Sequence, residues 1–364
     1  VVGDIHLGYR TKTNFFSSDF IVQVLKRFFN IKIKYSNDLP NILTSLPIKW
    51  LEWKPDVGQV KHDLILKIKN FYPAPKNIHV ILLNKCNLKC VMCPYYSSKY
   101  TKHFKSDFFD KYTPMNFDIF KKIVFFAKKN NSHLQFGQIE EPMMHKNLIE
   151  YLNYAKRNNV RMHMTTNGTL LNRTNIPNLV KSGLTSIMFS IDAYNESEYK
   201  KIRGENLKKL EENIQYFLKI NKKKIQTWVS FIIQKANHFD QDKFLLKWKK
   251  MGVDKVTFYK LGDHDPISGE LVNIDEWYKK EDRYTCSAPW NESVVYPKGE
   301  VSLCCRSMGK TGWDGIVSTG SLVNQSFDKI WSGYMYNKLR EELIENKFDK
   351  FKICENCNIW SNNK

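Results

Sequence analysis

The chain has 364 residues and a formal net charge of +20, with 57 lysine and arginine residues against 37 aspartate and glutamate residues. The lysines are scattered among asparagines along the chain, not grouped with arginines and aromatic residues, so nucleic acid is not expected as a partner. Hydrophobic residues make up 42% of the chain, but no run of about 18 apolar residues occurs, which excludes an ordinary membrane-spanning helix.

The redox compartment is indicated by the cysteines. No basic segment followed by an apolar stretch opens the sequence, so no signal peptide is expected. The eight cysteines stand close together in two regions, and such groups in a large chain more often bind metal or serve redox chemistry than form disulfides. We therefore predict a cytoplasmic protein.

The first 75 residues differ from the rest. Helical periodicity is present in 18–30 and again in 57–71, and Pro73 and Pro75 then separate this segment from the next one. No motif for a cofactor or substrate occurs there. We predict a mainly helical N-terminal extension over residues 1–75 and assign it no role.

Residues 76–262 alternate between strand-like and helix-like segments. Strands are predicted at 78–83, 133–137, 160–165, 185–191, 226–233 and 254–260. Helices are predicted near 116–129, 146–158, 175–182, 195–219 and 239–251. Such βαβ units form a parallel sheet, and right-handed crossovers curl it into a partial (β/α)6 barrel whose functional groups collect at the carboxyl ends of the strands.

Three cysteines follow the first predicted strand. Cys86, Cys90 and Cys93 are spaced x3 then x2, which places three thiolates on one short loop. A cubane iron–sulfur cluster takes four cysteines, so this loop would leave one iron open to a small molecule. A structural zinc site is the alternative, but zinc commonly needs a fourth ligand that the loop does not supply.

After residue 262 the alternation stops. Turn-rich segments lead to a predicted helix over 326–345, and the other five cysteines all lie in this part. We predict a small metal-stapled domain over 263–364. The four thiolates that could hold one closed cluster, or a zinc ion, are Cys286, Cys304, Cys354 and Cys357. Cys305 is surplus to this set and is expected to be a small buried thiol.

The loop of Cys86, Cys90 and Cys93 resembles the motif of the radical S-adenosylmethionine (radical SAM) superfamily. The resemblance implies a [4Fe–4S] cluster whose open iron binds SAM, and reductive cleavage of SAM to a 5′-deoxyadenosyl radical that abstracts hydrogen from a substrate. It also implies an external electron donor such as flavodoxin or ferredoxin.

Further segments resemble the superfamily in the same order. Gly137 to Pro142 is similar to the Gly-Gly-Glu-Pro segment that binds the amine of SAM, which implies contacts from Gly137 and Glu141. Glu140 stands where a glycine is usual, so either the loop shifts or the amine contact is altered. The segment 165–169 ends the third predicted strand and also resembles the superfamily, which implies that Asn167 contacts SAM.

The remaining SAM contacts implied by the resemblance lie at the later strands. Ser190 and Asp192 would face the ribose, Arg203 would meet the carboxylate, and the backbone at Leu261 would meet the adenine. The C-terminal cysteines, with Gly299 between Cys286 and Cys304, resemble the SPASM or shorter twitch domain. That resemblance implies a single auxiliary [4Fe–4S] cluster.

A fully ligated auxiliary cluster suits electron acceptance from a substrate radical. We therefore expect a two-electron oxidation of a small molecule such as a sugar or alcohol, with Asp263 or Asp265 as the base that takes the accompanying proton. Three alternatives stay open: a maturase that crosslinks a peptide, a non-catalytic zinc scaffold, and a degenerate member that holds SAM poorly because of Glu140.

Overall fold

The computed structural model of the chain describes residues 74–261, 271, 286–345, 347, 351–355 and 357. The two helices predicted in the N-terminal extension lie outside the described residues, as do Asp263 and Asp265. The structure therefore tests the predicted barrel and most of the C-terminal region.

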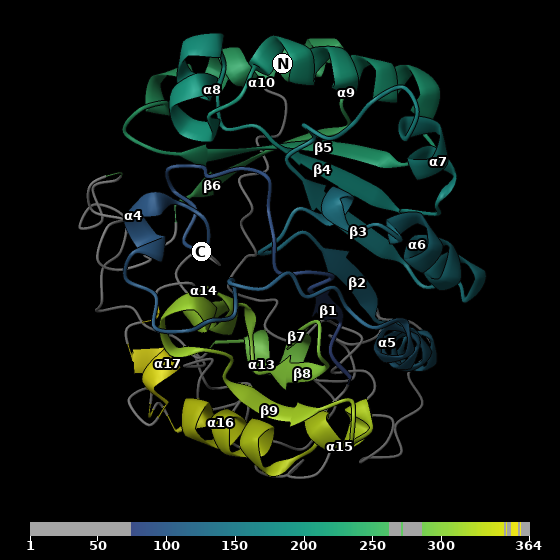
Figure 1. Ribbon diagram of the computed structural model, residues 1–364, viewed down its shortest axis with the longest axis vertical. Helices are drawn as coiled ribbons and strands as arrows, with labels where there is room; N and C mark the ends of the chain where they lie inside the picture. The colour runs from purple at the N-terminus through teal and green to yellow at the C-terminus, as the bar shows by residue number, and fades with distance from the viewer. Residues whose placement is uncertain are drawn as a thin grey trace, which may run out of the picture.

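A parallel sheet with helices on its outer face forms the larger part of the molecule (Figure 1). Each strand pairs in parallel with the next along the chain. The strands are β1 (Asn77–Val80), β2 (His133–Phe136), β3 (Met162–Thr166), β4 (Ser186–Ser190), β5 (Gln226–Ile233) and β6 (Lys255–Lys260). The covering helices are α5 (Phe117–Asn130), α6 (Leu148–Arg157), α7 (Ile176–Lys181), α8 (Glu196–Arg203), α9 (Leu207–Asn221) and α10 (Gln241–Met251). The predicted fold class is confirmed.

The predicted single helix over 195–219 is wrong, because the chain forms two helices there. Gly204 ends α8 in the left-handed conformation at φ 82°, which glycine adopts without the steric cost of a Cβ. Asn206 then caps the start of α9, and its side chain accepts a hydrogen bond from the backbone N–H of Lys209. The Gly-x-Asn sequence was the signal for this break.

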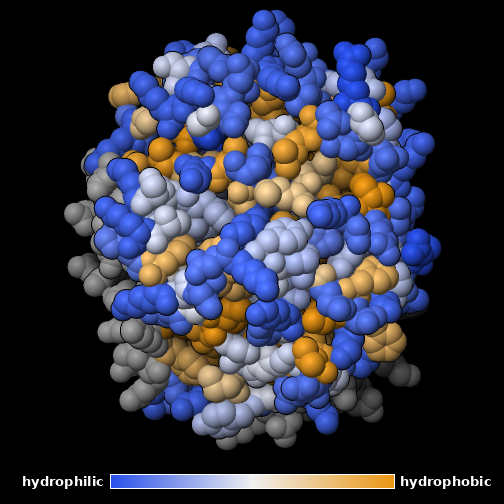
Figure 2. All heavy atoms as spheres, in the orientation of Figure 1, coloured by the Kyte–Doolittle hydropathy of each residue, from blue (hydrophilic) through white to orange (hydrophobic). Residues whose placement is uncertain are grey.

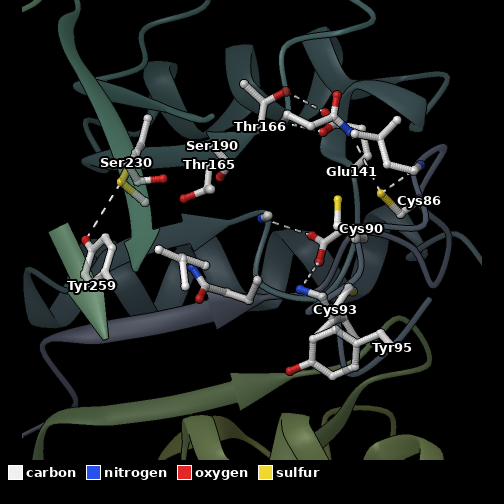
Figure 3. Close-up of a pocket in the computed structure, with 18 of the residues that line it drawn as sticks. Cys86, Cys90, Cys93, Tyr95, Glu141, Thr165, Thr166, Ser190, Ser230 and Tyr259 are labelled. Carbon is white, nitrogen blue, oxygen red and sulfur yellow. Dashed lines mark hydrogen bonds between the residues drawn. The ribbon is translucent and has the colours of Figure 1, made fainter. Parts of the chain in front are cut away.

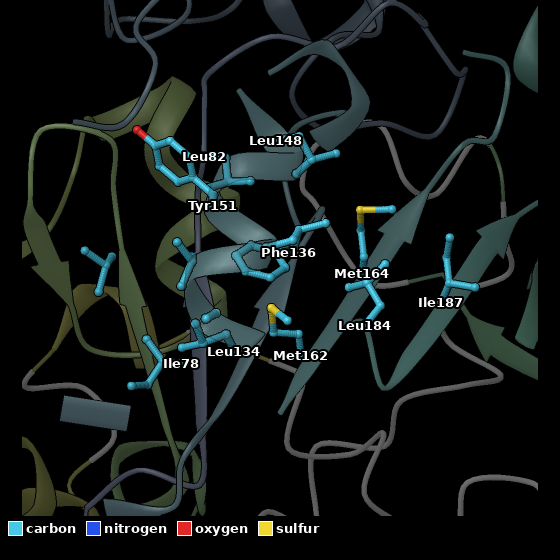
Figure 4. Packing of buried hydrophobic residues seen from close by; sticks show 14 of the residues in the cluster. Ile78, Leu82, Leu134, Phe136, Leu148, Tyr151, Met162, Met164, Leu184 and Ile187 are labelled. Atoms are coloured by element: carbon cyan, nitrogen blue, oxygen red, sulfur yellow. The ribbon is translucent and has the colours of Figure 1, made fainter. Parts of the chain in front are cut away.

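The strands of the barrel alternate between apolar and polar residues. The apolar residues pack outward against the helices, where Leu148 and Tyr151 of α6 meet them (Figure 4). This outward set includes Leu134, Phe136, Met162 and Met164, all buried. The intervening residues Gln135, His163 and Thr165 face the other way and line a cavity. A parallel sheet packed on both faces would read as continuous apolar runs, so the alternation marks a polar interior.

The C-terminal region continues the same sheet. β7 (Glu292–Val295) pairs in parallel with β1, and β8 (Glu300–Ser302) and β9 (Ser318–Ser321) follow antiparallel. In the described residues this makes one nine-stranded sheet in the order β6-β5-β4-β3-β2-β1-β7-β8-β9. Its helices are α13 (Ala288–Asn291), α14 (Cys305–Asp314), α15 (Phe327–Trp331), α16 (Tyr334–Ile344) and α17 (Lys352–Glu355). The domain boundary at residue 262 stays a prediction.

The helix predicted over 326–345 is also wrong as a single element. It is broken between α15 and α16 at Gly333, where a Cβ would lie 2.9 Å from the carbonyl oxygen of Lys329. The break lets α15 pack on α5 of the barrel. Phe327 stacks on Phe126 with ring centroids 4.2 Å apart, and Lys122 donates to the carbonyl of Leu322 at 2.6 Å.

The surface is rich in hydrophilic side chains, as the many charged residues of the sequence suggest. Figure 2 shows a largely hydrophilic face on which hydrophobic residues occur in small groups. Within the described part of the chain, none of the helices combines the length and the apolar character that crossing a bilayer would require.

Candidate active site

A cavity of about 630 Å³ opens at the carboxyl ends of the barrel strands. Figure 3 shows Cys86, Cys90 and Cys93 on one side of it and Ser230 and Tyr259 on the opposite side. The volume lies within the range of roughly 300–1,000 Å³ that is typical of small-molecule and cofactor sites. The cavity is therefore large enough for a cofactor and a small second group.

The cysteine loop is a short turn tied to the barrel. The backbone N–H of Cys93 donates to the carbonyl of Cys90 at 3.0 Å, and that of Val91 donates to the carbonyl of Ile202 in α8 at 3.0 Å. All three thiols are free of disulfides. Burial is the main cause that raises the pKa of Cys86 and of Cys93 to about 12, so both are protonated at neutral pH until a metal displaces the proton.

The hydrogen bonds to two of the three sulfurs fit an iron–sulfur cluster. The backbone N–H of Leu88 donates to the Sγ of Cys86 at 3.4 Å, and Asn167 Nδ2 lies 3.9 Å from the same sulfur. Arg203 Nη1 donates to the Sγ of Cys90 at 3.4 Å. Soft thiolates that accept such hydrogen bonds are the usual ligands of these clusters, and the hydrogen bonds tune their potential.

Glu141 joins the loops after β2 and β3. Its carboxylate accepts the backbone N–H of Met143 at 3.0 Å, the hydroxyl of Thr166 at 2.7 Å and the backbone N–H of Asn167 at 2.8 Å. Burial raises its pKa, while these donors favour the ionised form. Glu141 and Asn167 thus line the cavity from a rigid hydrogen-bonded corner, and their contact with SAM stays a prediction.

Glu140 occupies the place of a glycine by turning its side chain inward. Its buried carboxyl accepts the backbone N–H groups of Leu82 at 3.3 Å, Gly137 at 3.2 Å and Ile139 at 3.1 Å. Burial raises its pKa to about 7. Only glycine fits at position 137, where the backbone lies close to the β3 strand. Its φ is 82°, and a Cβ there would lie 1.9 Å from the carbonyl oxygen of Thr165.

Arg203 reaches the cavity with Asp192 behind it. The two side chains form a buried ion pair, and Asp192 also accepts the backbone N–H of Ile232 at 2.8 Å. The Arg203 guanidinium and this N–H favour the ionised carboxylate, although burial is the larger influence and raises the pKa of Asp192. Among the described residues that line the cavity, Arg203 is present and Asp192 is absent.

The other predicted SAM contacts lie at the same rim. Ser190 at the end of β4 and Leu261 just after β6 both line the cavity. Leu261 packs with Leu88, Cys90 and Met92, which places the end of β6 against the cysteine loop. The structure thus brings together all the predicted SAM contacts except Asp192, beside the three cysteines.

The second cysteine set comes from separate segments. Cys304 lies directly before α14, Cys286 lies before α13, and the backbone N–H of Cys357 donates to the carbonyl of Cys354 in α17 at 3.2 Å. Burial raises the pKa of Cys286 and, to about 12, that of Cys304; charges on the other cysteines of the set add to both shifts. The shifts of Cys286 and Cys304 thus include contributions from other cysteines of the set, and the binding of one cluster by all four stays a prediction. Cys305 lies beside them and is also buried enough for its pKa to be raised.

Several cavity residues were missed by the sequence analysis. They are His133, Gln135, His163, Ser186, Met188, Trp228, Ser230 and Tyr259. The signal was present in the alternation of polar with apolar residues in strands β2 to β5. Periodicity alone does not separate residues that face a cavity from residues that face a packed core.

Comparison with known families identifies the class of protein. Residues 80–258 match the model of the radical SAM superfamily. With a partial barrel and a three-cysteine loop at its rim, the chain belongs to this superfamily of enzymes. Residues 286–358 match the iron–sulfur cluster-binding SPASM domain, so the C-terminal region is a SPASM-type domain. The cofactors are SAM and iron–sulfur clusters in both regions.

Individual relatives are distant. The tungsten-containing aldehyde ferredoxin oxidoreductase cofactor-modifying protein of Pyrococcus furiosus is 22% identical over 324 residues, which cover 78% of this chain and 87% of the relative. The structure of SuiB from Streptococcus suis bound to precursor peptide SuiA has a TM-score of 0.59 at 13% identity, covering 92% of this chain and 90% of SuiB. The structure of BtrN in complex with AdoMet and 2-DOIA has a TM-score of 0.50 at 17% identity, covering 79% of this chain and 94% of BtrN.

Proposed function

We propose that the chain reductively cleaves SAM at the three-cysteine loop and oxidises a small molecule, such as a sugar or alcohol, by two electrons. The observation that carries this proposal is the cavity itself, in which three free thiols face a polar wall of strand residues. When bound, the cluster and SAM would supply an electron and a 5′-deoxyadenosyl radical that takes one hydrogen atom from the substrate.

The residue roles follow from position. Cys86, Cys90 and Cys93 would hold the cluster that receives SAM. Glu141, hydrogen-bonded in the corner between β2 and β3, would accept from the SAM amine, and Arg203 would donate to its carboxylate. Gly137, Asn167, Ser190 and Leu261 would complete the walls around SAM. Asp192 would hold the Arg203 guanidinium in place, which is a positioning role.

The direction of the reaction is proposed from the auxiliary cysteines. Cys286, Cys304, Cys354 and Cys357 would fill every corner of a second [4Fe–4S] cluster, so that cluster suits electron transfer better than substrate binding. The substrate radical would give up one electron to it and one proton to a base. Asp263 and Asp265 stay candidates for that base, next in the chain to Leu261 at the cavity rim.

A peptide substrate is the second candidate. The structure of SuiB, which matches nearly all of this chain in fold, was solved with a precursor peptide bound. BtrN, with the same fold class, was captured with AdoMet and a second ligand, 2-DOIA. Both likenesses concern the fold, so the choice between a small molecule and a peptide is made by experiment.

Anaerobic reconstitution with iron counting, followed by a 5′-deoxyadenosine assay with dithionite, tests the proposal. We expect a coloured iron protein that releases 5′-deoxyadenosine, and release that increases with a small-molecule pool rather than a peptide pool. Stimulation by peptides alone would favour the maturase. A colourless zinc protein would contradict the enzyme, and intact clusters without nucleoside release would indicate a member that Glu140 prevents from holding SAM.

A further inference from the structure

The inner wall of the cavity carries one row of hydrogen-bonding side chains across three strands. Gln135 of β2 is in register with His163 of β3, and His163 is in register with Ser186 of β4. Partners in register point to the same face of a sheet, and all three line the cavity. Trp228 of β5 lies beside this row, with its ring centroid 5.1 Å from that of His163. We call these four residues the polar floor.

His163 is the centre of the polar floor and is uncharged at neutral pH. Its Nδ1 lies 2.8 Å from the hydroxyl oxygen of Ser186, and its Nε2 lies 3.4 Å from that of Thr165. Burial lowers its pKa to about 4, and His79 of β1 adds to the effect. The neutral imidazole offers both a donor and an acceptor.

The charged groups around the floor are already engaged. Glu140 and Glu141 accept several hydrogen bonds each, and Arg203 is paired with Asp192. The Lys255 ammonium lies 4.7 Å from the centroid of the Trp228 ring, and Lys255 is not among the described residues that line the cavity.

The polar floor includes a hydrogen-bond donor that a substrate could use. The Trp228 Nε1–H is buried and has no hydrogen-bond partner among the described residues. Of the other titratable groups, Lys260 stands at the far rim, and burial lowers the pKa of His133. The floor thus holds uncharged side chains; the ring nitrogens of His163 contact Ser186 and Thr165, and the Trp228 Nε1–H is a donor that makes no hydrogen bond among the described residues.

We propose that Gln135, His163, Ser186 and Trp228 bind the reacting part of the substrate and select an uncharged hydroxyl or carboxamide group over a carboxylate, phosphate or ammonium. The inference rests on the proposed function and adds the substrate class. A buried charge without a counterion costs far more than a neutral group whose hydrogen bonds are made. The same chemistry is found in a free polyol and in a serine or asparagine side chain of a peptide, so both sources are candidates.

The test uses the reconstituted full chain with SAM and dithionite and measures 5′-deoxyadenosine formed above the substrate-free level. One arm supplies a metabolite extract separated by ion exchange into anionic, cationic and uncharged fractions. The other supplies acetyl-Gly-X-Gly-amide peptides in which X is serine, asparagine, aspartate or lysine. Stimulation by the uncharged fraction or by the serine and asparagine peptides supports the proposal. Stimulation by charged members only, or by no member of either arm, overturns it.

Two variants of His163 that are nearly isosteric with each other and differ in charge test the role of the floor. His163→Asn keeps it uncharged and should retain the stimulation within about threefold, whereas His163→Asp should reduce it by about tenfold or more. Gln135→Glu introduces a charge on the neighbouring strand and serves if His163→Asp does not fold, as judged by melting temperature and iron content. A folded charged variant that keeps full stimulation contradicts the proposal.

Two controls separate this proposal from the proposed function. His238→Asp makes the same change of charge at an exposed histidine outside the cavity and should have no effect. Substrate-free release of 5′-deoxyadenosine reports SAM cleavage alone, so the stimulation of each variant is expressed relative to its own substrate-free release. If the wild type releases none, the proposed function fails; if it releases nucleoside without preference for uncharged groups, only the polar floor is refuted.

Discussion

The two cysteine sets differ in how the chain assembles them. Cys86, Cys90 and Cys93 lie within eight residues on one loop. The loop is hydrogen-bonded to α8 and lines the cavity. The auxiliary set is drawn from separate segments between Cys286 and Cys357, near α13, α14 and α17, in the region where β7 pairs with β1. The first set is a local motif, and the second is a product of tertiary structure.

This difference carries a functional consequence. If the three cysteines of the first loop bind a cluster, one coordination position stays open to another molecule that enters the cavity. If the four auxiliary cysteines bind a second cluster, they would fill its coordination positions and link the separate segments that carry them. We therefore expect the first set to control SAM cleavage and the second to control turnover of the substrate and the stability of the C-terminal region.

The largest effect is expected at the cysteine loop. In Cys90→Ala, release of 5′-deoxyadenosine should fall to the protein-free level and iron content should drop by about half, because one of two cubanes loses a ligand. The variant also removes the sulfur to which Arg203 donates. Chromatography of the nucleoside and an iron assay measure both outcomes. Undiminished release of 5′-deoxyadenosine would contradict the assignment of SAM cleavage to the first cysteine set.

The auxiliary set should separate cleavage from turnover. Cys354→Ala should also lose about half of the iron, yet retain substrate-free nucleoside release within about threefold and lose product formation. Cys305→Ala is the matched control, since Cys305 lies beside the set and is surplus to four ligands; its iron content should be unchanged. Loss of nucleoside release from a Cys354→Ala protein with normal circular dichroism would show that the two sites act as one.

A smaller effect is expected from the backbone of the SAM-facing loops. Gly137→Ala places a Cβ 1.9 Å from the Thr165 carbonyl oxygen, so the β2 loop must move and we expect a loss of about 3 to 5 kcal/mol in unfolding free energy. Gly204→Ala has the same φ of 82° but nothing within 4 Å, so about 1 kcal/mol is expected. Denaturant unfolding compares them, and equal losses would mean that only backbone strain matters.

The smallest effect is a pH dependence from Glu140. Its folded-state pKa of about 7 is raised from 4.5, so the folded chain keeps a proton that the unfolded chain has released. Its contribution to stability is fully present below pH 4.5 and is lost as the pH rises through 7. Relative to Glu140→Gln, the wild type should lose about 1 kcal/mol of unfolding free energy between pH 6 and pH 8. If the difference in unfolding free energy between the wild type and Glu140→Gln does not change with pH, the pKa of Glu140 lies outside this window.

The barrel was predictable because its signals are local. The six barrel strands and the long helices between residues 77 and 260 follow from hydrophobic periodicity over a short window. Predicted helices were wrongly continuous where a glycine divides the pattern, at Gly204 in the barrel and at Gly333 in the C-terminal region. The polar floor was within reach of the same method. Its residues alternate with the outward apolar ones, but their function appears only when strands far apart in sequence place Gln135, His163 and Ser186 in one row.

The sequence by itself determined the class of protein, the three-cysteine loop and the order of the barrel elements, since spacing and periodicity act over a few residues. Only the tertiary structure decided that Glu140 turns inward onto three backbone N–H groups and that Asp192 stands behind Arg203. Only it showed β7 extending the barrel sheet. These features depend on burial and on contacts between distant segments, and no local pattern of residues encodes the solvent exclusion that makes such contacts favourable.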